Sequence, residues 1–215
     1  MSLTVHKYLL PALPTDHIYD QLAYKPTGST TSALITITHH ISCLLESSSY
    51  VRRILIDYCK AFDTINHLTL FQKLQQLTIP PNVLLWIINF LSGRTQAVSS
   101  FGQISAWLPV SRSIIQGSDI GPYLYLVYAS DLRTLSPHNV IIKYADDTVL
   151  LVGQHSSVDI IQEYDNICAW SARNKLTINT DDKTKKNRFP SACLSQYSAS
   201  FSRHSTSYTG EITWN

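Results

Sequence analysis

Two adjacent aspartates, Asp146 and Asp147, interrupt an otherwise apolar stretch, "NVIIKYADDTVLLV" at residues 139–152. The runs on either side are short and rich in aliphatic and β-branched residues, as buried strands are. We therefore expect a hairpin whose turn carries both carboxylates. Because like charges repel each other at such a turn, a divalent cation between their oxygens explains the pair best, and an ordinary solvated turn is the alternative.

A third carboxylate follows an earlier apolar run, "RILI", which we expect to be a strand over 54–56 that ends on Asp57. Mg²⁺ takes hard oxygen ligands, and three carboxylates can hold two ions about 3.5–4 Å apart, the arrangement that supports phosphoryl transfer. Asp57 is the best candidate because it ends a strand as Asp146 follows one. Asp63 is the competitor, but its place at the start of a helical region suits a cap or a surface role.

Composition narrows the class of protein without identifying a function. The 215 residues are 44% hydrophobic and 15% charged, which predicts one globular domain with a sizeable core. The net charge of +2 is too small to indicate a polyanion partner. The four cysteines lack a C-x-x-C spacing, and no apolar run reaches the roughly 20 residues of a membrane span. We expect a soluble intracellular protein with reduced thiols and no membrane partner, and its compartment, nuclear or cytoplasmic, stays open.

The rest of the chain mixes helices and strands without a regular βαβ alternation, which favours an α+β fold. We expect a helix from Ser29 or Thr30, two helices separated by Pro80 and Pro81, a hairpin around Phe101 and Gly102, and a buried helix after the "QGSDIGP" turn. Two later elements are a helix near 157–174 and a short strand over 175–179. The predicted inward faces of the helices near 67–78 and 157–174 consist of Leu68, Phe71, Leu74 and Leu77, and of Val158, Ile161, Tyr164, Ile167 and Cys168.

Three segments, in chain order, resemble core motifs of reverse transcriptases from non-LTR (LINE-like) retrotransposons. They are "LIDYCKAFDTINH" at Leu55–His67, "IIQGSDIGP" at Ile114–Pro122 and "YADD" at Tyr144–Asp147. The shorter segments "AYKPTGSTTSAL", "FLSGRTQAV" and "ARNKLTIN" agree with the same family. The resemblance covers roughly residues 8–186.

The resemblance implies a polymerase palm, an antiparallel sheet with helices packed on one face. Residues 1–50 would be a partial fingers region and the segment leading into the palm, residues 51–179 the palm core, and residues 180–215 a divergent and poorly ordered tail. The thumb, the fingers strand pair and the endonuclease of such elements are not recognisable. We therefore hypothesise a truncated or decayed copy.

The resemblance also implies roles for individual residues. Asp57, Asp146 and Asp147 would hold two Mg²⁺ ions, with Mn²⁺ as an alternative. Phe62 would lie under the incoming sugar and exclude a 2′-hydroxyl, or else be an ordinary core residue. The nucleotide and the template would contact Gln116, Gly117, Ser118 and Lys183, although Gly117 could form an ordinary turn and Lys183, like Lys185, could belong to a solvated charged run.

The implied activity is RNA-directed DNA polymerisation with an RNA template, a DNA primer and deoxynucleoside triphosphates. One alternative is an inactive remnant that binds nucleic acid or protein at most. Another is a metal-dependent nuclease or phosphatase, which leaves "QGSDIGP" and Phe62 unexplained. The sequence predicts no oligomeric state.

Overall fold

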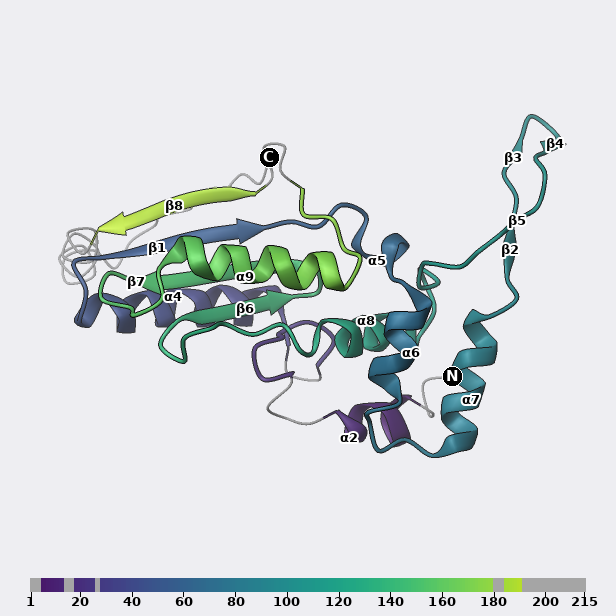
Figure 1. Ribbon diagram of the computed structural model, residues 1–215, viewed down its shortest axis with the longest axis horizontal. Helices are drawn as coiled ribbons and strands as arrows, with labels where there is room; N and C mark the ends of the chain where they lie inside the picture. The colour runs from purple at the N-terminus through teal and green to yellow at the C-terminus, as the bar shows by residue number, and fades with distance from the viewer. Residues whose placement is uncertain (1–4, 14–17, 26–27, 180–183, 191–215) are drawn as a thin grey trace, which may run out of the picture.

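The computed structural model describes residues 5–13, 18–25, 28–179 and 184–190. At its centre lies a four-stranded antiparallel sheet with the order β6-β7-β1-β8 (Figure 1). The strands are β1 (Tyr50–Ile56), β6 (Val140–Tyr144), β7 (Asp147–Gly153) and β8 (Lys185–Pro190). Pairing of β1 with β7 runs from Val51 opposite Gly153 to Ile56 opposite Thr148. Pairing of β6 with β7 runs from Val140 opposite Leu151 to Tyr144 opposite Asp147, which confirms the expected hairpin of two apolar strands.

Helices cover both faces of this sheet, so the expectation of helices on one face is wrong. Figure 1 shows α4 (Thr30–Glu46) and α9 (Ile160–Arg173) on opposite sides of the strands. One apolar cluster joins Ile54 and Leu150 to Ile167 of α9, and a separate one joins Leu151 to Leu45 of α4. Alternate residues of a strand face opposite ways, so the almost wholly apolar β7 requires a cover on each side.

The remaining helices lie beyond the end of the sheet where β1 finishes (Figure 1). They are η1 (Val5–Leu9), α2 (Leu10–Ala12), α5 (Ala61–Thr64), α6 (His67–Leu74), α7 (Pro81–Leu91) and α8 (Gly121–Ala129). Every residue of α8 except Pro122 and Tyr123 is buried. This confirms the buried helix expected after the "QGSDIGP" turn. Among the described helices none is both long and apolar enough to cross a membrane.

Side-chain caps explain where two predicted helices begin. The Ser29 hydroxyl accepts a hydrogen bond from the Ser32 amide (3.0 Å) at the start of α4. Asp159 and Gln162 form a capping box at the start of α9. Such caps satisfy amides that have no partner within the helix, and Ser29 is confirmed as an N-cap.

Two short strand pairs form an arm that projects from the body between α7 and α8 (Figure 1). Its base is β2 (Thr95–Gln96) paired with β5 (Leu108–Pro109), and its tip is β3 (Ser99–Ser100) paired with β4 (Gln103–Ile104). The turn between β3 and β4 is formed by Phe101 and Gly102, both with positive φ. The hairpin expected around these two residues is confirmed.

The inward faces of two helices differ from the prediction. Leu68 of α6 and Ile161 of α9 were predicted to be buried but are 67% and 64% exposed. In α6 the Nε2 atom of His67 lies 2.8 Å from the Ser113 carbonyl oxygen. Because this contact holds His67 against the body of the protein, the buried face of α6 consists of His67, Leu70 and Leu74.

The same kind of polar anchor sets the inward face of α9. Glu163 is fully buried, and its carboxylate accepts hydrogen bonds from the amides of Leu135 and Ser136 and from Asn139 Nδ2 (2.8–3.0 Å). An apolar periodicity cannot reveal a face that is fixed by a buried charge.

The C-terminal part of the described chain also departs from expectation. Residues 175–179 do not form a strand: Ile178 makes a single bridge to Tyr58. Residues 185–190, inside the tail expected to be poorly ordered, form β8 and pair with β1 from Leu55 opposite Lys185 to Tyr50 opposite Pro190. Strand pairing supplied by β1 gives order to a segment whose own composition predicts none.

The face of α6 can be tested with a pair of matched variants. Leu70→Ala should lower the free energy of unfolding by about 2–5 kcal/mol because it empties a fully buried site. Leu68→Ala should change it by no more than about 0.5 kcal/mol because that side chain is exposed. Urea denaturation followed by circular dichroism measures both, and equal losses would contradict the observed face.

Candidate catalytic site at the end of strands β1 and β7

The end of β1 and the beginning of β7 bring the three predicted aspartates, Asp57, Asp146 and Asp147, to one end of the sheet. We call this end of the sheet the carboxylate edge. The ladder ends at Ile56 opposite Thr148, and continuing this register by one residue places Asp57 opposite Asp147. Asp146 precedes Asp147 in the turn to β6. Cross-strand neighbours have Cβ atoms about 4.5–5.5 Å apart. Asp57 is therefore the third carboxylate at this edge, as the sequence predicted.

The turn that carries Asp146 is a two-residue hairpin. Tyr144 pairs with Asp147, and Ala145 and Asp146 connect them. Ala145 has φ +55°, a left-handed conformation that is unfavourable for a residue with a Cβ atom. A positive φ at the first turn residue fits hairpin turns that match the twist of the strands.

Asp57 is held by Asn179, which lies after α9 in the sequence. The Asn179 amide donates to the Asp57 carbonyl oxygen (2.8 Å), and its Nδ2 atom donates to Asp57 Oδ2 (3.1 Å). Sequence reasoning missed Asn179 because the contact spans 122 residues. It is the last residue of "ARNKLTIN", one of the segments that carry the family resemblance.

Burial and neighbouring carboxylates disfavour the charged forms of Asp146 and Asp147. Burial, and after it the charge of Asp57, raises the pKa of Asp146. Burial raises the pKa of Asp147, and the charges of Asp146 and Asp57 raise it further. Like charges have therefore been gathered where water is partly excluded.

Tyrosines flank this edge and extend the site. Burial raises the pKa of Tyr24, and the charge of Asp146 contributes. Burial also raises the pKa of Tyr125, with smaller contributions from neighbours that include Asp146 and Asp147. Both hydroxyls thus stay neutral beside the carboxylates.

The "QGS" turn packs on the segment that follows β1. The Ile114 amide donates to the Phe62 carbonyl oxygen (2.9 Å), and Gln116 Nε2 donates to Asp63 Oδ1 (2.8 Å). Asp63 therefore pairs with Gln116, and the register of β1 with β7 does not place it opposite Asp147 as it does Asp57. The Phe62 ring stacks on Tyr125 with 4.7 Å between centroids.

The other predicted contact residues are placed as follows. Gly117 is exposed with φ +79°, a conformation that favours glycine. The Ser118 hydroxyl donates to the Ile115 carbonyl oxygen (2.6 Å) and accepts from the Gly121 amide (3.1 Å) at the start of α8. Lys183 lies outside the described residues. The backbone of Lys185 begins β8, opposite Leu55.

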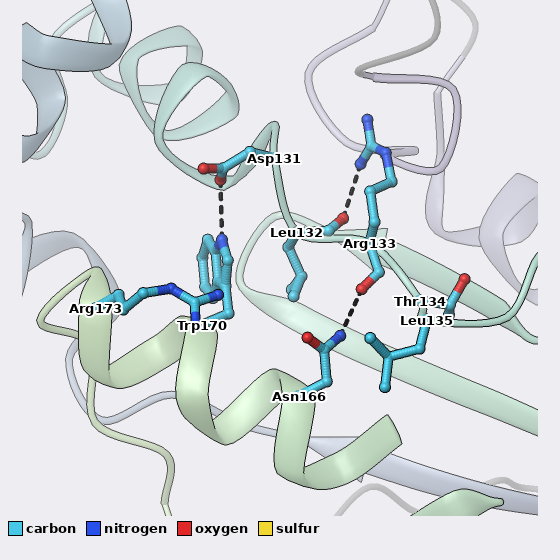
Figure 2. Close-up of a pocket in the computed structure, with 8 residues that line it drawn as sticks. All are labelled: Asp131, Leu132, Arg133, Thr134, Leu135, Asn166, Trp170 and Arg173. Carbon is cyan, nitrogen blue, oxygen red and sulfur yellow. Dashed lines mark hydrogen bonds between the residues drawn. The ribbon is translucent and has the colours of Figure 1, made fainter. Parts of the chain in front are cut away.

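A separate pocket of about 190 Å³ lies between the loop after α8 and helix α9 (Figure 2). There Trp170 Nε1 donates to Asp131 (2.9 Å), and Asn166 Nδ2 donates to the Arg133 carbonyl oxygen (2.9 Å). None of the three site aspartates lines this pocket. This pocket is therefore separate from the place where the three aspartates lie.

Residues 3–210 match the family described as "Reverse transcriptase (RNA-dependent DNA polymerase)". The chain belongs to the reverse transcriptase family. It is 31% identical over 172 residues to the RNA-directed DNA polymerase from mobile element jockey of Drosophila melanogaster, covering 75% of this chain and 19% of that protein. It is 27% identical over 183 residues to the probable RNA-directed DNA polymerase from transposon X-element of the same species, and this match covers 79% of this chain and 20% of that protein. The resemblance to non-LTR retrotransposon enzymes is thereby confirmed, and the chain spans about a fifth of the length of these relatives.

Solved structures confirm a reverse transcriptase palm fold. Telomerase from Candida tropicalis, in complex with a TWJ fragment of telomeric RNA, superposes with a TM-score of 0.64 at 10% identity, over 86% of this chain and 34% of that one. Telomerase from Candida albicans, in a similar complex, gives a TM-score of 0.62 at 11% identity, over 87% and 33%. These neighbours show the fold alone. The predicted α+β palm is correct.

Reverse transcriptases use divalent metal ions, and the donor set at the carboxylate edge fits them. Its carboxylate oxygens are the hard ligands that Mg²⁺ prefers, and burial, with a further contribution from neighbouring carboxylates, raises the pKa values of Asp146 and Asp147. Within the described ranges, no three His, Cys, Asp or Glu side chains converge closely enough to enclose an ion. Mutual repulsion opposes such convergence, and a bound cation would remove that repulsion.

The raised pKa of Asp147 predicts a pH-dependent gain in stability on neutralisation. A carboxyl whose folded pKa exceeds its unfolded value stabilises the fold fully only at low pH, and this contribution is lost as the pH rises through the folded pKa. In metal-free buffer, Asp147→Asn should therefore raise the free energy of unfolding at neutral pH, but by no more than about 0.5 kcal/mol, because the side chain is exposed and solvent screens its charge. The gain should shrink as the pH falls towards the ordinary aspartate value of 3.8. Urea denaturation over this range measures the gain, and a pH-independent gain or any loss at neutral pH would contradict the account.

Proposed function

We propose that this chain is the catalytic part of an RNA-directed DNA polymerase that extends a DNA primer on an RNA template. The observation that supports it best is the position of Asp57 and Asp147 on adjoining strand ends, with Asp146 in the turn between β6 and β7. The "QGS" turn packs on Phe62 and Asp63. The Phe62 ring stacks on Tyr125, and the charges of the site aspartates contribute to the raised pKa of that tyrosine. A carboxylate edge alone would suit several phosphoryl-transfer enzymes, and the family narrows the choice to polymerisation.

The proposed reaction transfers a nucleotidyl group from a deoxynucleoside triphosphate to the primer 3′-hydroxyl. The 3′-oxygen forms a bond to the α-phosphorus, the bond between this phosphorus and the bridging oxygen breaks, pyrophosphate leaves, and the hydroxyl proton passes to solvent. Two bound Mg²⁺ ions, or Mn²⁺ in their place, would stabilise the attacking and leaving oxygens. We propose Asp57, Asp146 and Asp147 as their ligands.

The remaining side chains would position substrates. Asn179 fixes one oxygen of the Asp57 carboxylate and leaves the other for a cation. The exposed Gly117 allows a close backbone approach by the nucleotide or the template, beside Gln116 and Ser118. Lys183 stays a predicted contact to the triphosphate.

No observation favours the alternative of an inactive remnant, since the three aspartates and the "QGS" turn are all present. The alternative of a nuclease uses the same three aspartates but gives no role to the stacked Phe62. Hydrolysis of a labelled strand in the absence of nucleotides would revive it.

Primer extension tests the proposed activity. The chain should incorporate deoxynucleotides on a primed RNA template with Mg²⁺, and Asp57→Asn or Asp146→Asn should lower the rate by at least about 10²-fold. Asp165→Asn, at an exposed aspartate of α9, should leave the rate unchanged. A folded chain that extends no primer with Mg²⁺ or Mn²⁺ would refute the proposal.

The proposed role of Phe62 predicts a loss of sugar discrimination. Phe62→Ala should lower the preference for deoxynucleotides over ribonucleotides by about 10-fold or more, because the bulk that excludes the 2′-hydroxyl is gone. Phe71→Ala removes another half-buried phenylalanine and should leave the preference unchanged. Competition between the two kinds of nucleotide measures it, and equal preferences in both variants would make Phe62 a packing residue only.

A further inference from the structure

The outer edge of β6 is covered by a short segment from the N-terminal part of the chain. β6 is the edge strand of the sheet, so the backbone groups on its outer side need partners. The Lys143 amide donates to the Asp20 carbonyl oxygen (2.7 Å), and the Leu22 amide donates to the Lys143 carbonyl oxygen (2.8 Å). These two bonds form a parallel bridge between Gln21 and Lys143. Ala145 is the next residue along the strand direction whose backbone amide and carbonyl groups point outward from the sheet.

The side chain of Gln21 continues the pairing to Ala145. The Ala145 amide donates to Gln21 Oε1 (2.9 Å), and Gln21 Nε2 donates to the Ala145 carbonyl oxygen (3.0 Å). The Ala23 amide also donates to Oε1 (3.0 Å), which fixes the carboxamide from the other side. Gln21 is only 2% exposed, so losing these bonds would leave buried polar groups without partners.

The segment that carries Gln21 is itself fixed in place. The buried Asp20 carboxylate forms an ion pair with the buried Lys143 ammonium, with 3.0 Å between Oδ2 and Nζ. The same ammonium donates to the carbonyl oxygen of Ala129 (3.1 Å), the last residue of α8, and to that of Leu132 (3.3 Å) in the loop that follows. Breaking such a pair would strand a buried charge, so the position of Gln21 is strongly determined.

We propose that Gln21 is a positioning residue for Asp146. Ala145 directly precedes Asp146, and its backbone has a positive φ that a residue with a Cβ atom adopts only when its surroundings impose it. The carboxamide of Gln21 binds both the amide and the carbonyl group of Ala145, so it fixes the orientation from which the Asp146 side chain projects. This inference rests on the proposed function only in that Asp146 is taken to bind a divalent cation.

Two readouts on the chain 1–215 test the proposal without requiring polymerase activity. The first is hydrogen exchange of the Ala145 amide, followed by NMR after selective labelling of alanine with ¹⁵N. The second is the dissociation constant for Mn²⁺, followed by electron paramagnetic resonance. The variant is Gln21→Met, which keeps the size of the side chain and removes its hydrogen bonds. The matched control is Gln154→Met, because Gln154 Oε1 accepts one bond from the Ser49 amide (3.1 Å) at the opposite end of β7.

In Gln21→Met the Ala145 amide should exchange about 10-fold faster while the Ala129 amide of α8 stays unchanged. The Mn²⁺ dissociation constant should rise about 10-fold, the effect of losing a group that orients a metal ligand. Gln154→Met should change neither quantity. Should Gln21→Met fail to fold, Gln21→Asn, whose shorter side chain cannot reach both atoms of Ala145, replaces it with the same expectations.

Different failures have different signatures. Unchanged exchange in a folded Gln21 variant would show that Gln21 does not hold the turn. Faster exchange with unchanged Mn²⁺ affinity would show that holding the turn does not position a ligand, and either result would overturn the inference. If the wild-type chain bound no Mn²⁺, or bound it equally well after Asp146→Asn, the proposed function would fail first and the positioning role with it.

Discussion

The antiparallel pairing of β1 with β7 is the constraint on which the site depends. Side chains alternate along a strand, so shifting the register by one residue would move each strand's inward residues to the opposite face. Apolar clusters on both faces oppose such a shift, since α9 packs against Ile54 and Leu150 and α4 against Leu151. The core thereby fixes which residues emerge at the end of the ladder, and these are Asp57 and Asp147.

This arrangement has an energetic cost that a purely structural protein would avoid. Three carboxylates lie near one another at this end of the sheet, and burial together with mutual repulsion raises the pKa values of two of them. The turn adds an alanine in a left-handed conformation. Strain and unfavourable electrostatics at one place indicate a functional site, because the surrounding structure has to maintain them. Here Gln21, Asn179 and the buried Asp20–Lys143 pair maintain them.

Local patterns predicted the local structure well. The hairpin around the paired aspartates, the cap at Ser29, the arm around Phe101 and Gly102 and the third carboxylate at Asp57 all follow from short segments of sequence. The predictions were wrong where a distant polar partner decides, as for Leu68, displaced from the core by the contact of His67, and for Ile161, displaced by the buried Glu163. Gln21, Asn179 and strand β8 were missed because each depends on pairing across most of the chain, which the pattern of a single sequence cannot reveal.

Binding of a paramagnetic cation tests the central claim most directly. With aspartate selectively labelled with ¹⁵N, substoichiometric Mn²⁺ should broaden the amide signals of Asp57, Asp146 and Asp147 first, and excess Mg²⁺ should restore them. The signals of Asp131 and Asp165 should change only at much higher Mn²⁺, because Asp131 is paired with Lys73 and Asp165 lies exposed on α9. Broadening that begins at those two residues, or that affects all aspartates equally, would contradict a metal site built by the ends of β1 and β7.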